Sequence, residues 1–135
     1  MTRRWLFALV VVAACSRSDS NAPPPSPAPP GHVAAAQPSK DPAKARQVIA
    51  AGGAVVLDVR TPEEFGDDHL PTATNVPVDD LANRLADVDR LAGGDKAKPI
   101  VVYCHAGGRA ARAKHELEAA GYTNVTNGGG LRDLR

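Results

Sequence analysis

Residues 101–113, VVYCHAGGRAARA, decide both the fold and the chemistry that we expect of this chain. The apolar half of the segment predicts a buried strand that delivers Cys104 to a turn holding Gly107 and Gly108, and a helical pattern begins at Arg109. The backbone N–H groups at a helix start converge on one point, where the helix dipole adds partial positive charge. Because such a site favours the reactive thiolate, we predict that Cys104 is a catalytic nucleophile, with a buried, inert thiol as the alternative.

Strand and helix patterns alternate from residue 40 to residue 135. The nearly continuous apolar runs at 54–59 and 99–103 are typical of strands that are buried on both faces of a parallel sheet. The alternation predicts one α/β domain, in which ligands bind beyond the carboxyl ends of the strands. Further strands are expected at 75–77 and 123–126, and helices are expected to begin near Asp41, at a Thr61 capping box, at Asp79 or Asp80, and at Arg109.

The first 39 residues differ in composition from this domain. Residues 1–14 place Arg3 and Arg4 before an apolar run, which is typical of a secretory signal and shorter than the roughly 20 residues of a membrane-spanning helix. Residues 15–39 are rich in proline, serine and alanine, so they cannot bury a core. We expect them to form an extended linker, with a proline-rich ligand for a partner as the alternative.

The end of the apolar run, Val12-Ala13-Ala14-Cys15, resembles a bacterial lipobox. The resemblance implies that Cys15 is lipidated and becomes the mature N-terminus of a periplasmic protein anchored to the cell envelope membrane. Ser16 suggests the outer membrane, and an ordinary cleaved signal is the alternative. Cys15 and Cys104 are the two cysteines of the chain, so lipidation of the first leaves the second without an intramolecular partner. A lone thiol in an oxidising compartment indicates a functional group.

Charge and ligand spacing exclude some functions. The 16 basic residues include Arg3 and Arg4, so the mature chain carries 14 basic residues against 15 acidic ones. The sequence has no basic patch or aromatic stacking platform, and we therefore expect no nucleic-acid partner. Cys104 followed directly by His105 is not a zinc pattern, and we predict neither a metal nor a cofactor.

Several segments in the same order resemble the rhodanese family. They are VVLDVR at 55–60 with EEF at 63–65, HLP at 69–71 through NVP at 75–77, YCHAGGRA at 103–110, and 117–122 with Val125 and Gly128-Gly129. The resemblance covers roughly residues 41–130 and implies a small parallel-sheet rhodanese-like domain, at 40–135, with helices on both faces. It also implies a single-domain sulfurtransferase of the thiosulfate type.

In that family the nucleophile corresponds to Cys104. Its thiolate attacks the outer sulfur of thiosulfate and releases sulfite, and the persulfide is passed to cyanide or another thiophilic acceptor. Partners are therefore a small-molecule sulfur donor and acceptor. Covalent catalysis needs an activated thiol, and the persulfide anion needs a cradle of N–H donors. The residues expected to form this substrate-binding cradle are His105, Ala106, Gly107, Gly108 and Arg109.

Other readings of single residues stay open at this point. Arg109 either contacts the sulfonate oxygens of the substrate or pairs with an acidic residue at a helix start. His105 either acts as a general base for the thiol or points to solvent or substrate. Asp58 and Arg60 are expected to form an internal ion pair that supports the strand ends, with contact to the loop as the alternative. His69 is expected to make a structural hydrogen bond.

Loop length separates sulfur transfer from related chemistry. Four residues lie between Cys104 and Arg109, whereas cysteine phosphatases and the related phosphatase branch of this fold have five and form a wider cradle. The tighter loop favours sulfur over phosphoryl groups. A cysteine-based phosphatase or arsenate reductase, or a non-catalytic sulfur-carrier or binding module, are the alternatives.

Overall fold

The computed structural model describes residues 39–135. The predicted signal peptide, the predicted lipidation site Cys15 and most of the predicted linker lie outside the described residues. Within 39–135, no helix is long and apolar enough to span a membrane.

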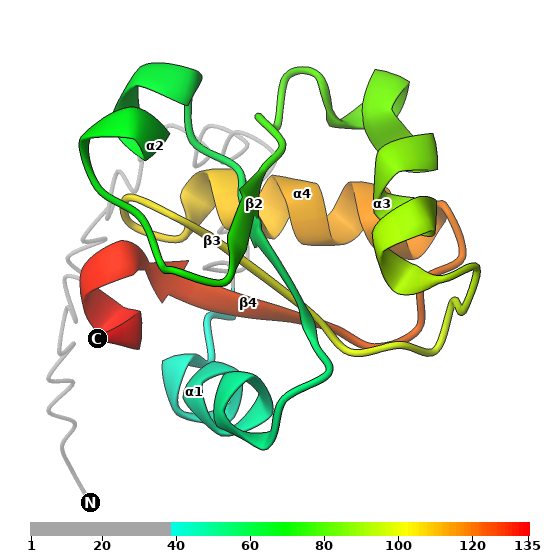
Figure 1. Cartoon of the computed structure of the whole chain (residues 1–135), viewed down its shortest axis with the longest axis horizontal. Helices are drawn as coiled ribbons and strands as arrows, with labels where there is room; N and C mark the ends of the chain where they lie inside the picture. Colours follow the sequence, from blue (N-terminus) through cyan, green and yellow to red (C-terminus); the bar gives the residue numbers. More distant parts are fainter. Residues whose placement is uncertain (1–38) are drawn as a thin grey trace, which may run out of the picture. The chain divides into compact units, whose positions relative to one another are not determined.

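Four parallel strands form a single sheet in the order β2-β1-β3-β4 (Figure 1). The two central strands are the ones that the apolar runs predict, and every residue of both is buried. The parallel sheet of an α/β domain is therefore confirmed. The strands are β1 (Val55–Asp58), β2 (Ala73–Asn75), β3 (Ile100–Cys104) and β4 (Val125–Gly130).

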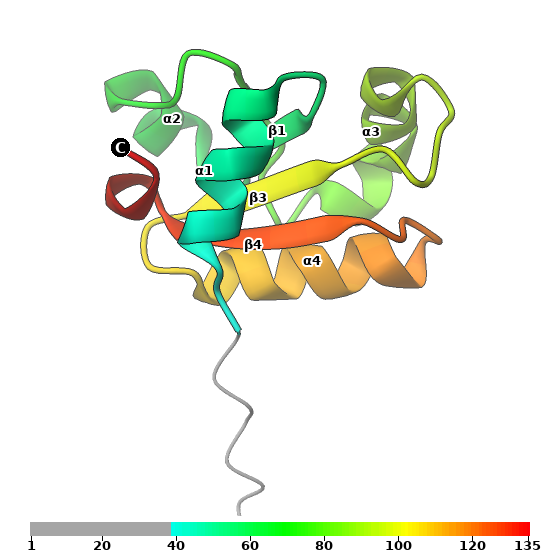
Figure 2. The ribbon, with the colours of Figure 1, turned by 90° about the horizontal axis from the view of Figure 1, so that it is seen from below.

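Helices cover both faces of this sheet (Figure 2). On one face, α1 (Pro42–Ala51) and the 3-10 helix η2 (Leu131–Leu134) pack with the inward side chains Val56, Val101 and Tyr103. On the other face, α3 (Leu85–Ala92) and α4 (Gly108–Ala119) pack with alternate strand residues such as Leu57 and Val102. Successive strand residues point to opposite faces, so each central strand contributes to two apolar layers. The helix α2 (Pro62–Asp67) follows the end of β1.

Local capping signals explain where the helices begin. The Asp41 side chain accepts a hydrogen bond from the Lys44 N–H at 2.9 Å, and a proline occupies the first helical position of α1. At α2, the Thr61 hydroxyl accepts from the Glu64 N–H, and the Glu64 carboxylate accepts from the Thr61 N–H. The predicted capping box at Thr61 is confirmed.

Several boundaries differ from the sequence-based expectation. The strand expected at 75–77 lies at Ala73–Asn75, and α4 begins at Gly108 rather than at Arg109. The helix expected from Asp80 begins as the 3-10 helix η1 (Leu81–Arg84) and becomes α3 at Leu85. The strand expected to end at Thr126 runs on to Gly130, because β4 stays paired with β3 as far as Cys104. Glycine is depleted in strands, so the run at 128–130 did not predict one. Its place in the sheet comes from pairing with β3.

The layer formed by α4 supplies a test of the packing. Leu117 on α4 is fully buried, whereas Leu91 on α3 is 40% exposed. We expect Leu117→Ala to lower the free energy of unfolding by about 2–5 kcal/mol, because the removed atoms leave a cavity in the core. The matched control Leu91→Ala should change it by less than about 0.5 kcal/mol. Urea denaturation of both variants measures the difference, and equal losses would contradict the assignment of α4 to the core.

Candidate active site

The Cys104 thiol lies at the carboxyl end of β3, at the start of a tight loop. The residue is 2% exposed and is a free cysteine. Its Sγ accepts a hydrogen bond from the Gly107 N–H at an N···S distance of 3.0 Å. A backbone N–H donor therefore faces the sulfur at the point where the helix α4 (Gly108–Ala119) begins.

Gly107 connects this loop to α4. It is the N-cap residue of the helix and has a φ of +102°, in the left-handed region that favours glycine. Its carbonyl oxygen accepts the Ala111 N–H at 2.9 Å, as an N-cap carbonyl does. The first turn of α4 therefore starts beside the sulfur, where the helix dipole places partial positive charge.

The predicted ion pair between Asp58 and Arg60 is confirmed. Arg60 Nη2 and Asp58 Oδ2 are 2.7 Å apart, and both side chains are buried. Arg60 Nε also donates to the Asp58 carboxylate, which raises the pKa of Arg60 above its usual range. The guanidinium carbon lies 5.8 Å from the centre of the Tyr103 ring. The pair thus fixes the end of β1 against the strand that carries the thiol.

Arg109 forms an ion pair across the site with Glu64 of α2. Its two terminal nitrogens donate to the two carboxylate oxygens at 2.6 and 2.9 Å, the bidentate geometry of a strong pair. This is the alternative that the sequence left open for Arg109, and a contact between Arg109 and substrate stays a prediction. The Arg109 hydrogen bonds lower the pKa of Glu64 to about 2.

The capping box expected at Thr61 accounts for one contact of Glu64, but the sequence did not identify Arg109 as its second partner. The acidic residue in a capping box is a local signal, whereas its partner Arg109 is 45 residues away in the chain. Sequence reasoning also missed Asn127, a side chain of β4 that is 2% exposed and donates to the Gly107 carbonyl. A polar residue inside a buried strand, next to glycines, was the available signal.

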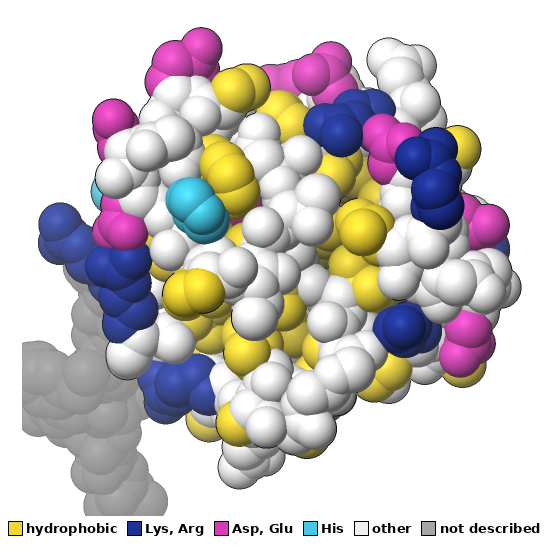
Figure 3. Space-filling model, in the orientation of Figure 1, with side chains coloured by type: hydrophobic (Ala, Val, Ile, Leu, Met, Phe, Trp, Pro, Cys, Tyr) yellow, Lys and Arg dark blue, Asp and Glu magenta, His cyan; other side chains and the backbone are white. Residues whose placement is uncertain are grey.

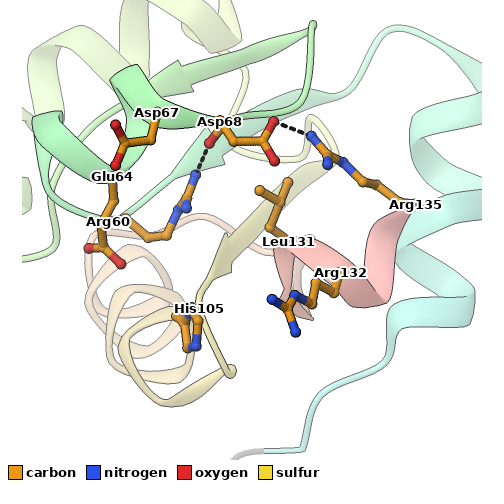
Figure 4. A pocket seen from close by; sticks show the side chains of 8 residues that line it. All are labelled: Arg60, Glu64, Asp67, Asp68, His105, Leu131, Arg132 and Arg135. Atoms are coloured by element: carbon orange, nitrogen blue, oxygen red, sulfur yellow. Dashed lines mark hydrogen bonds and ion pairs between the residues drawn. The ribbon is translucent and has the colours of Figure 1, made fainter.

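A cavity of about 550 Å³ opens beside the loop (Figure 4). His105 is exposed and borders this cavity, so its side chain faces solvent or substrate, while its role as a base stays a prediction. Arg135 pairs with Asp68 across the rim. The walls come from the end of β1, from α2 and from η2. The lining residues are Arg60, Glu64, Asp67, Asp68, His105, Leu131, Arg132 and Arg135.

His69 has the structural contacts that the sequence predicts for it. His69 Nδ1 lies 2.8 Å from the Phe65 carbonyl, and its ring stacks on Phe65, as expected of a structural histidine. Residues 39–135 contain no cluster of three or more potential metal ligands. Acidic and basic side chains are interspersed around the face shown in Figure 3, which carries no continuous basic patch.

Comparison with known proteins gives this site its context. Residues 41–132 match the model of the rhodanese-like domain. The chain belongs to the rhodanese family. This rhodanese-like domain is 40% identical over 78 residues to the thiosulfate sulfurtransferase PspE of Escherichia coli, a match that spans 58% of this chain and 71% of that protein.

The chain is also similar to a human sulfurtransferase and to a solved bacterial structure. The human thiosulfate:glutathione sulfurtransferase is 32% identical over 90 residues, which span 61% of this chain and 78% of that protein. A solved structure described as a rhodanese with anions from E. coli superimposes with a TM-score of 0.53 at 39% identity, over 59% of this chain and 89% of its own. The chain is a rhodanese-type enzyme, and these relatives support sulfurtransferase activity.

The Glu64–Arg109 pair predicts a pH dependence of stability. The pKa of Glu64 is lowered from 4.5 to about 2 in the folded domain, so its contribution is present above pH 4.5 and is lost as the pH falls toward 2. We expect Glu64→Gln to lack this component: the stability difference between wild type and variant should be constant above about pH 5 and shrink below it.

Urea denaturation from pH 7 to pH 2 measures this difference. The control Glu118→Gln removes a carboxylate that pairs with Lys114 on the exposed side of α4. A Glu64→Gln difference that stays constant down to pH 2 would contradict the prediction.

Proposed function

We propose that this enzyme transfers sulfane sulfur from thiosulfate, or from another persulfide donor, to a thiophilic acceptor through a persulfide on Cys104. The hydrogen bond from the Gly107 N–H to Cys104 Sγ carries the proposal. It places a neutral backbone donor, at the start of a helix, on the one atom that must be anionic to attack. The sulfurtransferase relatives support the same chemistry.

The proposed reaction has two steps. The Cys104 thiolate attacks the outer sulfur of thiosulfate, a new S–S bond forms to Sγ, and the old S–S bond breaks with its electron pair leaving on sulfite. The terminal sulfur of the resulting persulfide is anionic. An acceptor such as cyanide then attacks that terminal sulfur, which leaves as thiocyanate, and the electron pair of the broken S–S bond returns to Sγ. The backbone N–H groups of residues 105–109 are the proposed cradle for the extra sulfur.

The cavity beside His105 carries charges of both signs. Arg60, Arg132 and Arg135 line it together with Glu64, Asp67 and Asp68, and Arg60 is paired with Asp58, so the lining alone does not select an anionic donor. The E. coli structure that this chain resembles was solved with anions. In this chain Arg109 is held by Glu64, so we propose that any contribution of Arg109 to donor binding is made together with that carboxylate.

The mechanism predicts that thiosulfate leaves one sulfur atom on Cys104. Intact-mass measurement of the full chain after incubation with thiosulfate should show the added mass of one sulfur, which cyanide then removes. Cys104→Ser should show neither the adduct nor thiosulfate:cyanide turnover, because an alcohol does not form the persulfide. Cys15→Ser is the matched control and should behave as the wild type.

Each other result would point to a different function. Full turnover by Cys104→Ser would overturn the mechanism. Release of phosphate from an aryl phosphate faster than sulfur transfer would favour the phosphatase alternative. A wild type without adduct and without turnover would leave the binding-module alternative.

We also propose that the domain is held in the bacterial periplasm by a lipid on Cys15. The support is the lipobox-like sequence at 12–15 and the proline-rich stretch that follows it. When the full chain is produced in a bacterium with labelled palmitate, we expect the label on the wild type and on Cys104→Ser but not on Cys15→Ser. Labelling that persists in Cys15→Ser, or is absent from the wild type, would contradict the lipid anchor.

A further inference from the structure

The side chain of Asn127 bridges β4 and the loop that carries the thiol. Its Nδ2 donates to the Gly107 carbonyl oxygen at 3.2 Å, and its Oδ1 accepts the Gly129 N–H at 2.9 Å. The residue is 2% exposed. The amide orientation is fixed by these partners, since a flipped amide would place its NH₂ against an N–H and its oxygen against a carbonyl.

The bridge starts from an irregularity in the sheet. Val102 pairs with Asn127 and Cys104 pairs with Gly130, so β4 uses three steps where β3 uses two. The extra residue makes a bulge, in which Gly129 has a φ of +83° and turns its N–H toward the Asn127 side chain. The bulge therefore leaves the Asn127 amide group free to donate away from the strand, toward the loop.

The atom that Asn127 contacts belongs to the residue that binds the sulfur. The Gly107 N–H donates to Cys104 Sγ at 3.0 Å, and the Gly107 carbonyl accepts from Asn127. Glycine in the left-handed region has a wide choice of backbone angles, so its N–H is not held in place by its own conformation. The Ala111 N–H also donates to the Gly107 carbonyl, but that bond lies within the first turn of α4 and does not connect Gly107 to the sheet.

We propose that Asn127 is a positioning residue for sulfur transfer: it ties Gly107 to the sheet and thereby holds the Gly107 N–H on the Cys104 sulfur. Asn127 does not touch the sulfur or the substrate in this role. Its effect passes through Gly107 to the stability of the thiolate. The inference deepens the proposed function, on which it rests for its catalytic meaning.

The test measures the thiolate directly. The rate at which iodoacetamide alkylates Cys104 is followed against pH in the full chain, by peptide mapping so that Cys15 does not contribute. Asn127→Ser keeps a hydroxyl that can accept the Gly129 N–H but is too short to reach Gly107. We expect the pH midpoint of alkylation to rise by about one unit, or about tenfold slower alkylation below it, because a hydrogen bond to the anionic sulfur is weakened.

Further variants separate positioning from damage to the fold. Asn127→Ala is a second neutral variant, and the same rise is expected of it. Asn127→Asp keeps the acceptor for Gly129, loses the donor and adds a charge, so its rise should be at least as large. Thr126→Val is the matched control: Thr126 is also buried on β4 but lies on the opposite face of the strand, and its midpoint should equal that of the wild type.

The outcomes decide the proposal. A wild-type midpoint in a folded neutral variant, checked by circular dichroism, would overturn it. If the midpoint rises in Asn127→Asp alone, the effect comes from the new charge and the proposal is overturned. An equal rise of the midpoint in Thr126→Val would also overturn it. Alkylation needs no sulfur donor, so this result is independent of the persulfide experiment. A wild type that forms no persulfide would overturn the proposed function and leave the positioning of the thiol to be judged by its midpoint.

Discussion

The hydrogen bond between the Gly107 N–H and Cys104 Sγ is the interaction on which the site depends. The sulfur lies at the end of a central strand and its residue is 2% exposed, so the groups in contact with it are almost all protein groups. The loop has four residues in which to leave the sheet, turn back and begin α4. A backbone donor can face the sulfur in so short a turn when one residue adopts a left-handed conformation, and Gly107 does so. The proposed thiolate chemistry thus accounts for a glycine at position 107, which is also the N-cap residue of α4.

Two ion pairs lie beside this loop, and they differ in burial and in the elements that they connect. Asp58 and Arg60 are both buried and lie two residues apart, so the pair forms within one strand end. Removing charges from water is costly, and such a pair is weak evidence for stability but good evidence for a fixed geometry. Arg109 and Glu64 are each about one third exposed and join two helices. That pair connects α4 to α2, and thus the thiol loop to the opposite side of the cavity.

The sequence predicted the features that depend on residues close together in the chain, namely the helix cap at Thr61 and the two central strands. Thr61 and Glu64 lie close enough in the chain for their capping box to be recognised, and the apolar runs of β1 and β3 required no knowledge of their partners. The pairing of Glu64 with Arg109 and that of Asn127 with Gly107 depend on how the strands are ordered in the sheet. Local sequence patterns do not reveal that order, so these contacts could not be derived from the spacing of residues along the chain. The family resemblance predicted the loop correctly as a loop but did not indicate that Arg109 is already paired.

The glycines of β4 show why composition misled the prediction of that strand. A Cβ on Gly130 would lie 2.3 Å from the His105 carbonyl oxygen, a distance that no side chain tolerates. A Cβ on Gly129 would lie 2.6 Å from Asp133 Oδ2, the oxygen that accepts the Gly130 N–H. Bare backbone is thus needed on one side for the thiol loop and on the other for η2. Because η2 also supplies Leu131 and Arg132 to the cavity, the same strand end supports both the floor of the site and one of its walls. At these positions the thiol loop and η2 leave no room for a side chain, so glycine is required there. Contacts that form only in the folded chain outweigh the low strand propensity of glycine.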